Sequence, residues 1–214
     1  SVNAYAAILN YLASRYNGSG HGRIEHWIMH NEVDMATTWT NMGNPPEMVY
    51  IDEYLKSMRM CYNIVRQYDQ NASVLGSYTH SWTYGADGYS TKNMLEQTVR
   101  YSQVEGDFWW GVAHHPYPQN LSKPDFWIND TQSTYNQKSS YVTFKNLEVI
   151  NDWILADENR YQGSVKRNLF LSENGTNSPS YSETDLARQA AGGCWAWKKA
   201  NALEGIDAFM WHNW

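Results

Sequence analysis

The strongest constraint on the fold is an order of elements, because helix and strand patterns alternate five times along the chain. Val2, Tyr5, Leu9 and Leu12 recur at three- and four-residue steps, which is the spacing of one helix face. Short apolar segments that read as strands follow at residues 24–29, 73–78, 108–114, 168–172 and 206–210. Helices alternating with short buried strands predict an α/β fold with a parallel sheet.

The chemistry-bearing residues favour a barrel over an open, doubly wound sheet. A doubly wound nucleotide-binding fold usually has a Gly-rich turn after its first strand, but the Gly-rich residues 18–22 precede a strand. Polar and aromatic residues instead follow every predicted strand: His30, Asn31 and Glu32; Tyr78 and His80; His115 and Tyr117; Glu173; Trp211 and His212. One ring of strand ends that supplies one site is typical of the (β/α)8 (TIM) barrel.

The chain of 214 residues is short for that fold, since a complete barrel has eight strands and about 250 residues. We expect residues 1–214 to be the C-terminal part of a single catalytic domain, covering roughly strands 4–8. Strands 1–3 and the final helix would be missing, and the N-terminal part of the same barrel would be the segment's partner. An open arc of strands leaves unpaired backbone groups, so we expect the segment alone not to fold stably.

Composition excludes two other classes of protein. The net charge is −6, and no cluster of Lys and Arg occurs, which argues against a nucleic-acid partner. No apolar run approaches the roughly 20 residues of a membrane span. Hydrophobic residues make up 42% of the chain, enough for a globular core.

Glu32 and Glu173, each at a predicted strand end, are the candidate catalytic residues. Glycoside hydrolysis needs two carboxyl groups that flank one bond, one protonated to assist the leaving group and one ionised. Two strand ends of a barrel can hold such a pair at a fixed separation, in environments that set the two pKa values apart.

Four motifs then resemble the clan A retaining glycoside hydrolases, over residues 24–214. His-Asn-Glu at residues 30–32 resembles the end of that clan's fourth strand, and Leu-Phe-Leu-Ser-Glu-Asn-Gly at 169–175 resembles its seventh. Two predicted strands intervene, as that numbering requires. His-Pro-Tyr at 115–117 is similar to the sixth strand, and Phe-Met-Trp at 209–211 to the eighth.

The resemblance implies a role for each matching residue. Glu32 would be the acid/base and Glu173 the nucleophile of a double displacement on a poly- or oligosaccharide. Asn31 would hold the sugar 2-hydroxyl, and the Tyr117 hydroxyl would donate to the nucleophile. Trp211 would form the floor of the subsite for the cleaved sugar.

Further substrate-binding candidates are His80, Trp82 and His115, which follow the second and third predicted strands. For Trp82, as for Trp39 and Trp127, the sequence leaves sugar stacking and loop packing both open. No cofactor or metal is implied. Enzymes of this clan often act outside the cytoplasm, so the resemblance suggests an extracellular or periplasmic location. The identity of the sugar is not predicted.

Two alternatives are kept. A metal-dependent barrel hydrolase would use the strand-end histidines, namely His30, His80, His114, His115 and His212. A carbohydrate-binding barrel without catalysis is the other. For a retaining enzyme the two carboxyl groups should lie about 5–5.5 Å apart, whereas an inverting enzyme needs roughly 6.5–9.5 Å.

Overall fold

The computed structural model describes residues 1–85 and 88–212. Its sheet has five parallel strands that pair in chain order. They are β1 (His26–Met29), β2 (Ser73–Tyr78), β3 (Trp110–His114), β4 (Leu169–Asn174) and β5 (Ala208–Trp211). The predicted α/β class and parallel sheet are confirmed. Residues 213–214, which follow the fifth predicted strand, lie outside the described part.

One helix precedes β1, and helices connect each strand to the next. They are α1 (Val2–Arg15), α2 (Ala36–Trp39), α3 (Glu47–Val65), α4 (Thr91–Glu105), α5 (Phe126–Asn129), α6 (Glu148–Leu155) and α7 (Glu183–Asn201), with 3-10 turns η1 (Phe144–Asn146) and η2 (Asp157–Asn159). Ser1, Ser90 and Ser182 cap α1, α4 and α7, because each hydroxyl accepts from a backbone N–H in the first turn. Within the described residues, no helix combines the length and apolar character that crossing a membrane requires.

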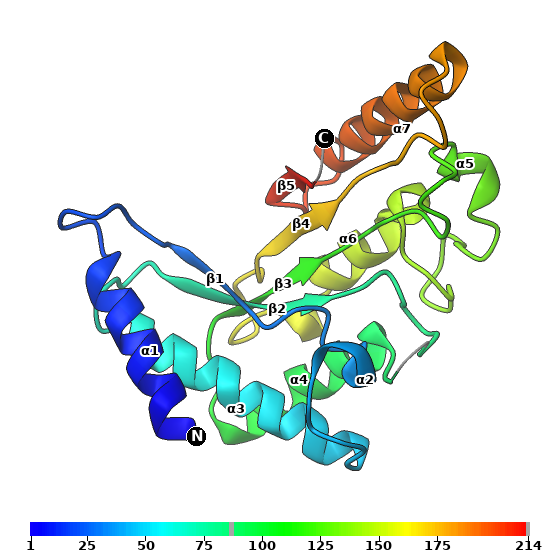
Figure 1. Ribbon diagram of the computed structural model, residues 1–214. Helices are drawn as coiled ribbons and strands as arrows, with labels where there is room; N and C mark the ends of the chain where they lie inside the picture. The colour runs from blue at the N-terminus through cyan, green and yellow to red at the C-terminus, as the bar shows by residue number, and fades with distance from the viewer. Residues whose placement is uncertain (86–87, 213–214) are drawn as a thin grey trace.

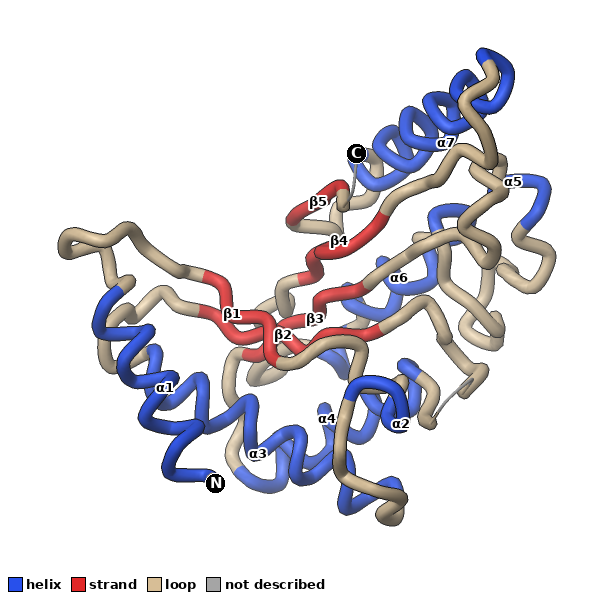
Figure 2. The backbone as a smooth tube through the Cα atoms, viewed as in Figure 1, coloured by secondary structure: helices blue, strands red, loops and turns tan. Residues whose placement is uncertain are grey.

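The sheet curls, and the long helices follow its outer side, as in part of a (β/α)8 barrel (Figures 1 and 2). Alternate side chains of a strand point to opposite faces. The inner face carries Leu75, Ala113 and Phe170, and Ala208 packs on them. The outer-facing side chains of β1 to β4 pack against the helices in two larger clusters.

The inner face is open at both edges of the sheet. Ile28 on β1 is 39% exposed, and Met210 on β5 is 41% exposed. Their neighbours Trp27 and Phe209 turn the other way, into the helix-covered clusters. The concave side of the sheet is therefore accessible along the edge strands, and the strand ends open onto it.

A buried ion pair joins the N-terminal ends of β3 and β4. Arg167 is fully buried, and its guanidinium donates to both Asp107 oxygens at 2.9 and 2.8 Å. It also donates to the carbonyls of Asn159 and Phe108 at 2.9 Å each and lies 4.1 Å from the Trp110 ring centroid. Arg167 thus provides hydrogen bonds to several acceptors at the N-terminal ends of the strands, opposite their carboxyl ends.

Replacing Arg167 by methionine should destabilise the protein by about 3–5 kcal/mol, because the change leaves the Asp107 charge unpaired and little exposed. Arg188→Met is the matched control. Arg188 pairs with Asp125 at 2.7 Å, but its side chain is 43% exposed, so the cost should stay below about 1 kcal/mol. Urea unfolding of both variants measures the two free energies. Equal losses of unfolding free energy in the two variants would show that burial does not strengthen the Arg167–Asp107 pair.

Candidate active site

The carboxyl ends of the strands bring Glu32, His115 and Glu173 together. One ligand atom of each, two carboxylate oxygens and a ring nitrogen, lies within 4.8 Å of the others. His115 Nδ1 is 2.9 Å from Glu32 Oε1 and 4.0 Å from Glu173 Oε2. One carboxylate oxygen of Glu32 thus lies within 4.8 Å of one oxygen of Glu173, an approach that fits the retaining spacing of about 5–5.5 Å better than the inverting range of roughly 6.5–9.5 Å.

Glu32 sits on a strained turn after β1. His30 and Glu32 both have positive φ values, 61° and 42°. Non-glycine residues rarely adopt this backbone conformation, which is often found at functional sites. Two tyrosines of α3 hold the turn, since the Tyr54 hydroxyl donates to the Met29 carbonyl at 2.8 Å and the Tyr50 hydroxyl to that of Val33 at 2.6 Å.

Ser77 closes a hydrogen-bonded ring around Glu32. The Glu32 backbone N–H donates to Ser77 Oγ at 3.0 Å, and Ser77 Oγ lies 3.4 Å from His115 Nε2. With Glu32 ionised, these contacts fit a His115 ring whose Nδ1–H donates to the Glu32 carboxylate and whose Nε2 accepts from the serine hydroxyl. Ser77 was not among the predicted site residues, although a serine inside an apolar strand is the signal that could have found it.

The other oxygen of Glu32 faces Trp39. The indole Nε1–H of Trp39 donates to Glu32 Oε2 at 2.9 Å. Burial raises the pKa of Glu32. The hydrogen bonds from His115 and Trp39, together with the electrostatic interaction with His115, outweigh burial, so the pKa of Glu32 is lowered. Trp39, left open by the sequence between stacking and packing, thus contacts a candidate catalytic group.

Replacing His115 by alanine should raise the pKa of Glu32, because the variant loses the hydrogen bond that stabilises the ionised carboxylate. Carbon-13 NMR titration of labelled glutamate, assigned with Glu32→Gln, measures the shift. His21→Ala, at an exposed position, is the control and should leave the Glu32 titration unchanged. An unchanged Glu32 titration in His115→Ala would contradict the assigned hydrogen bond.

The same pair makes stability depend on pH. The pKa of Glu32 is lower in the folded protein than in the unfolded chain. The ionised Glu32 therefore stabilises the folded state fully at pH values above the unfolded-state pKa. This stabilisation is lost as the pH falls through the folded-state pKa. His115→Ala should therefore lose less stability on acidification than the wild type.

Glu173, near the end of β4, accepts a hydrogen bond from Tyr117. The Tyr117 hydroxyl lies 3.1 Å from Glu173 Oε1, as the resemblance predicts. Burial raises the pKa of Tyr117, and the adjacent Glu173 raises it further, so the phenol keeps its proton for this bond. Oε1 is thus engaged by Tyr117, and Oε2 is the Glu173 oxygen without this bond.

Asn174, next to Glu173, is fully buried and fixes the end of β4. Its side-chain Nδ2–H groups donate to the carbonyls of Leu171 and Met210 at 2.9 Å each. The pairing of β4 with β5 shifts register between Leu171 and Asn174. This irregularity lies immediately at Glu173 and re-aims the backbone there.

Asn31 precedes Glu32 in the chain, and His80 lies near enough to Glu32 for the two charges to interact. Asn31 is half-buried, and no side-chain hydrogen bond occupies its amide within the described residues. His80 packs edge-on to Tyr141, with ring centroids 5.2 Å apart. Burial lowers the pKa of His80 to about 4, against the opposing charge of Glu32. Asn31 therefore offers free polar atoms, and His80 is a neutral neighbour.

Two predicted substrate contacts need correction, and a third stays a prediction. Trp82 is fully buried, with its ring edge-on to Trp153, so it belongs to the core and cannot stack on a sugar. Trp211 is half-buried, stacks on Phe144 at 6.2 Å and lies close to both Gly193 and Gly175, so its role as the floor of a sugar subsite stays a prediction. His115 is only 3% exposed, so it positions the carboxylates and does not form a sugar-binding surface.

Asp34 is a buried carboxyl that the sequence analysis missed. It accepts from the Thr79 backbone N–H at 2.9 Å, from the Thr79 hydroxyl and from the Thr91 hydroxyl at 3.1 Å. Burial raises the pKa of Asp34 to about 6, against these hydrogen bonds. Asp34 thus ties the Glu32 turn to the end of β2 and the start of α4. No local pattern pairs residues so far apart in sequence.

The strand-end histidines do not converge on one metal centre. Burial lowers the pKa of His114 to about 3, and its Nε2 bonds to the Val142 carbonyl at 2.9 Å. His30 bonds to Ser57 at 2.9 Å and stacks on Tyr5, toward the helices. Within residues 1–85 and 88–212, the group that could hold an ion is Glu32, His115 and Glu173. Among the described residues, His30 and His114 therefore do not join His115 in one candidate ion site.

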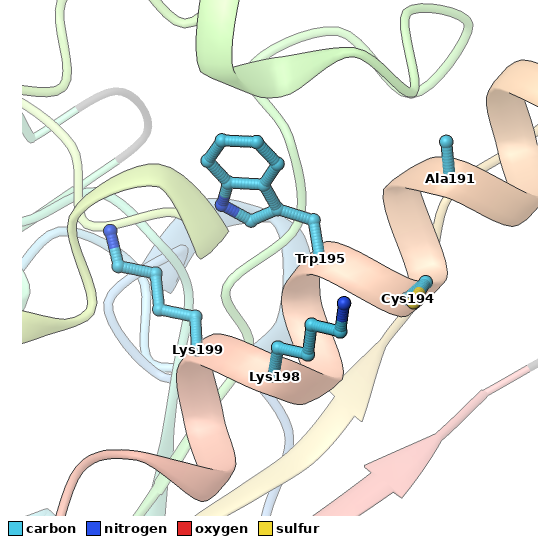
Figure 3. Close-up of a pocket in the computed structure, with 5 residues that line it drawn as sticks. All are labelled: Ala191, Cys194, Trp195, Lys198 and Lys199. Carbon is cyan, nitrogen blue, oxygen red and sulfur yellow. The ribbon is translucent and has the colours of Figure 1, made fainter.

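A separate hollow of about 600 Å³ lies along α7 (Figure 3). Ala191, Cys194, Trp195, Lys198 and Lys199 line it. Neither Glu32 nor Glu173 is among them. Trp127, whose role the sequence left open, stacks on Trp195 at 4.9 Å and packs between α5 and α7. This hollow is not part of the carboxylate site.

Comparisons with solved structures identify the fold. The chain is similar to a family 39 glycoside hydrolase from Bacteroides cellulosilyticus WH2, with a TM-score of 0.61 and 16% identity over 99% of this chain and 38% of that one. A glucosidase from Croceicoccus marinus gives 0.59 and 14%, over 99% and 38%. A family 1 β-glucosidase from Thermotoga maritima gives 0.54 and 10%, over 98% and 57%.

These identities establish the fold alone, and the chain spans 38% to 57% of the length of those structures. The predicted resemblance to clan A glycoside hydrolases is confirmed at that level. No curated protein matches the chain in sequence. A family model described as "Family of unknown function (DUF5722)" matches residues 1–214.

Proposed function

The chain belongs to the family of unknown function DUF5722, and from its site we propose that it is a retaining glycoside hydrolase acting on a poly- or oligosaccharide. One observation carries the proposal: Glu32 and Glu173, from two strand ends, have carboxylate oxygens within 4.8 Å of each other. A nucleophile must touch the sugar directly, so retaining enzymes keep the two groups closer than inverting ones do.

In the first step, Glu173 Oε2 attacks the anomeric carbon and the bond to the leaving oxygen breaks. Glu32 gives its proton to that oxygen, and a glycosyl ester on Glu173 forms. Tyr117 donates to Glu173 Oε1 at 3.1 Å, which orients the carboxylate so that Oε2 faces the sugar. The Asn31 amide, half-buried and without an internal partner among the described residues, would hold the sugar 2-hydroxyl.

In the second step, Glu32 acts as the base. It removes a proton from water, and the resulting oxygen attacks the anomeric carbon and releases Glu173. His115 and Trp39 contact the two oxygens of Glu32 at 2.9 Å each and hold it in place for both steps. Both hydrogen bonds favour the ionised form of Glu32, which is the form the base step needs.

The stereochemical course tests the proposal. A panel of aryl glycosides is screened for hydrolysis, and the first product formed is followed by proton NMR before mutarotation. We expect the hemiacetal to have the anomeric configuration of the substrate, because two inversions restore it. The opposite anomer would contradict the double displacement while leaving a hydrolase. Binding of sugars without any turnover would instead support the non-catalytic barrel.

A further inference from the structure

We propose that a cavity between residues 30–42 and α3 is the subsite for the leaving-group sugar, with Trp39 as its platform. The assignment rests on the proposed function, since the role of Glu32 defines which sugar leaves. The cavity has a volume of about 490 Å³. It is lined by His30, Val33, Trp39, Thr40, Asn41, Met42, Tyr50, Glu53, Tyr54 and Ser57.

Trp39 joins this cavity to the acid/base. Its Nε1–H donates to Glu32 Oε2 at 2.9 Å, while its side chain lines the cavity and the residue is 55% exposed. One edge of the indole is therefore held by the carboxylate, and the rest of the ring is available for contact. Glu32 itself does not line the cavity, so the hydrogen bond from Trp39 is what places a group packed on Trp39 next to that carboxylate.

The contacts of Glu32 indicate on which side of it the attacked sugar and the leaving sugar would bind. Its Oε1 faces His115, which also approaches Glu173 Oε2 at 4.0 Å, whereas its Oε2 faces Trp39. The nucleophile and the cavity thus lie toward different oxygens of the acid/base. The sugar attacked by Glu173 would lie over Tyr117, and the leaving sugar would lie over Trp39.

The lining fits a neutral pyranose. A pyranose has apolar C–H faces and a rim of hydroxyl groups, so it needs an apolar platform bordered by polar atoms. Trp39 and Met42, which is 40% exposed, supply the platform. Asn41 and Glu53 supply polar groups beside it, and the volume falls within the range of small-molecule sites.

The wall of the cavity is rigid. The hydroxyls of Tyr50 and Tyr54 point inward and donate to main-chain carbonyls of the β1 end at 2.6 and 2.8 Å. The His30 ring bonds to Ser57 Oγ at 2.9 Å. Because the polar atoms of Tyr50, Tyr54 and His30 are already engaged, these residues shape the site. Glu53 Oε1 accepts from Lys56 at 2.8 Å, so Asn41 and the exposed surfaces of Trp39 and Met42 provide the remaining contacts.

Reactivation of a trapped intermediate tests the assignment. The protein is labelled with 2-deoxy-2-fluoro glycosyl fluorides of the gluco, galacto, manno and xylo series, which form a slowly hydrolysed ester on Glu173. Cellobiose or xylobiose is then added as an acceptor. Its hydroxyl gives a proton to Glu32 and attacks the anomeric carbon, the ester bond breaks, and free enzyme returns. Reactivation saturates with acceptor, which gives the acceptor's dissociation constant for the cavity.

Three variants and a control are compared. Met42→Ala and Trp39→Ala should each raise that dissociation constant by about tenfold or more, since each removes an apolar contact. Trp39→Phe keeps a ring without the Nε1–H, so the constant should rise less than in Trp39→Ala. Met48→Ala, at a position on α3 that is 68% exposed and outside the lining, is the control and should match the wild type.

The outcomes separate this assignment from the proposed function. A labelled enzyme whose reactivation responds identically in wild type, Met42→Ala and Trp39→Ala would overturn the leaving-group subsite alone. Failure of all the fluorosugars to label Glu173 would overturn the proposed function and the subsite with it. Met42→Ala keeps the test decisive if Trp39→Ala is poorly folded, because Met42 makes no hydrogen bond to Glu32.

Discussion

Replacing Glu173 by alanine is expected to lower kcat by about 10⁴-fold or more, because the variant cannot form the covalent intermediate. Glu173 Oε2 is the oxygen left free by Tyr117 and faces the space beside Glu32. No other carboxylate joins this group within the described residues, so none can take its place. The initial rate of aryl glycoside hydrolysis measures the loss.

Azide should restore turnover in Glu173→Ala. It fills the space of the lost carboxylate and attacks the anomeric carbon, while Glu32 protonates the leaving oxygen. The product should be a glycosyl azide of inverted configuration, identified by NMR. Glu204→Ala, at an exposed position after α7, is the matched control and should keep wild-type rates. A Glu173→Ala variant that retains more than about a tenth of wild-type kcat would remove Glu173 from the chemistry.

Replacing Glu32 by alanine should lower kcat on oligosaccharides by about 10²–10⁴-fold, the usual contribution of general acid–base catalysis. The loss should depend on the leaving group. A 2,4-dinitrophenolate needs no proton, so the first step stays fast and the glycosyl-enzyme accumulates, visible as a burst. Azide should then release a product of retained configuration. An equal loss for both substrate types would contradict the acid role of Glu32.

The pH dependence of kcat/KM is a second test of the role of Glu32. The acid step needs its proton, so kcat/KM should fall as the pH rises through the pKa of Glu32 in the free enzyme. Because His115 and Trp39 lower that pKa, the fall should lie on the acidic side of neutrality. Glu32→Ala should lack this limb. A wild-type profile that stays flat up to neutral pH would contradict the lowered pKa.

The order of helices and strands could be predicted from the spacing of apolar residues. The two catalytic candidates could be predicted because each glutamate directly follows or ends a predicted strand. β2 begins and ends where the apolar run does, at Ser73 and Tyr78. β1 and β3 begin two residues later than the sequence indicates, because Ile24 and Phe108 pack on the core before strand pairing begins. α2 and α5 have four residues each, too few for a periodic pattern to show.

The tryptophans show what the sequence could not decide. Trp39 and Trp82 both follow a predicted strand, and nothing local separates them. Trp82 is buried against Trp153, whereas Trp39 is 55% exposed and donates to Glu32. The difference depends on which long-range partner each ring meets. The same is true of Ser77 and Asp34, whose partners lie between 38 and 57 residues away.

The most direct test of the retaining mechanism is the mass of the protein after labelling. Incubation with the 2-deoxy-2-fluoro glycosyl fluoride that inactivates the protein should add the mass of one fluoroglycosyl group. Peptide mapping should locate that group on Glu173. The label should be absent from Glu173→Ala and present in Glu204→Ala. A label on any other residue, or hydrolysis of aryl glycosides without a covalent adduct, would contradict the account.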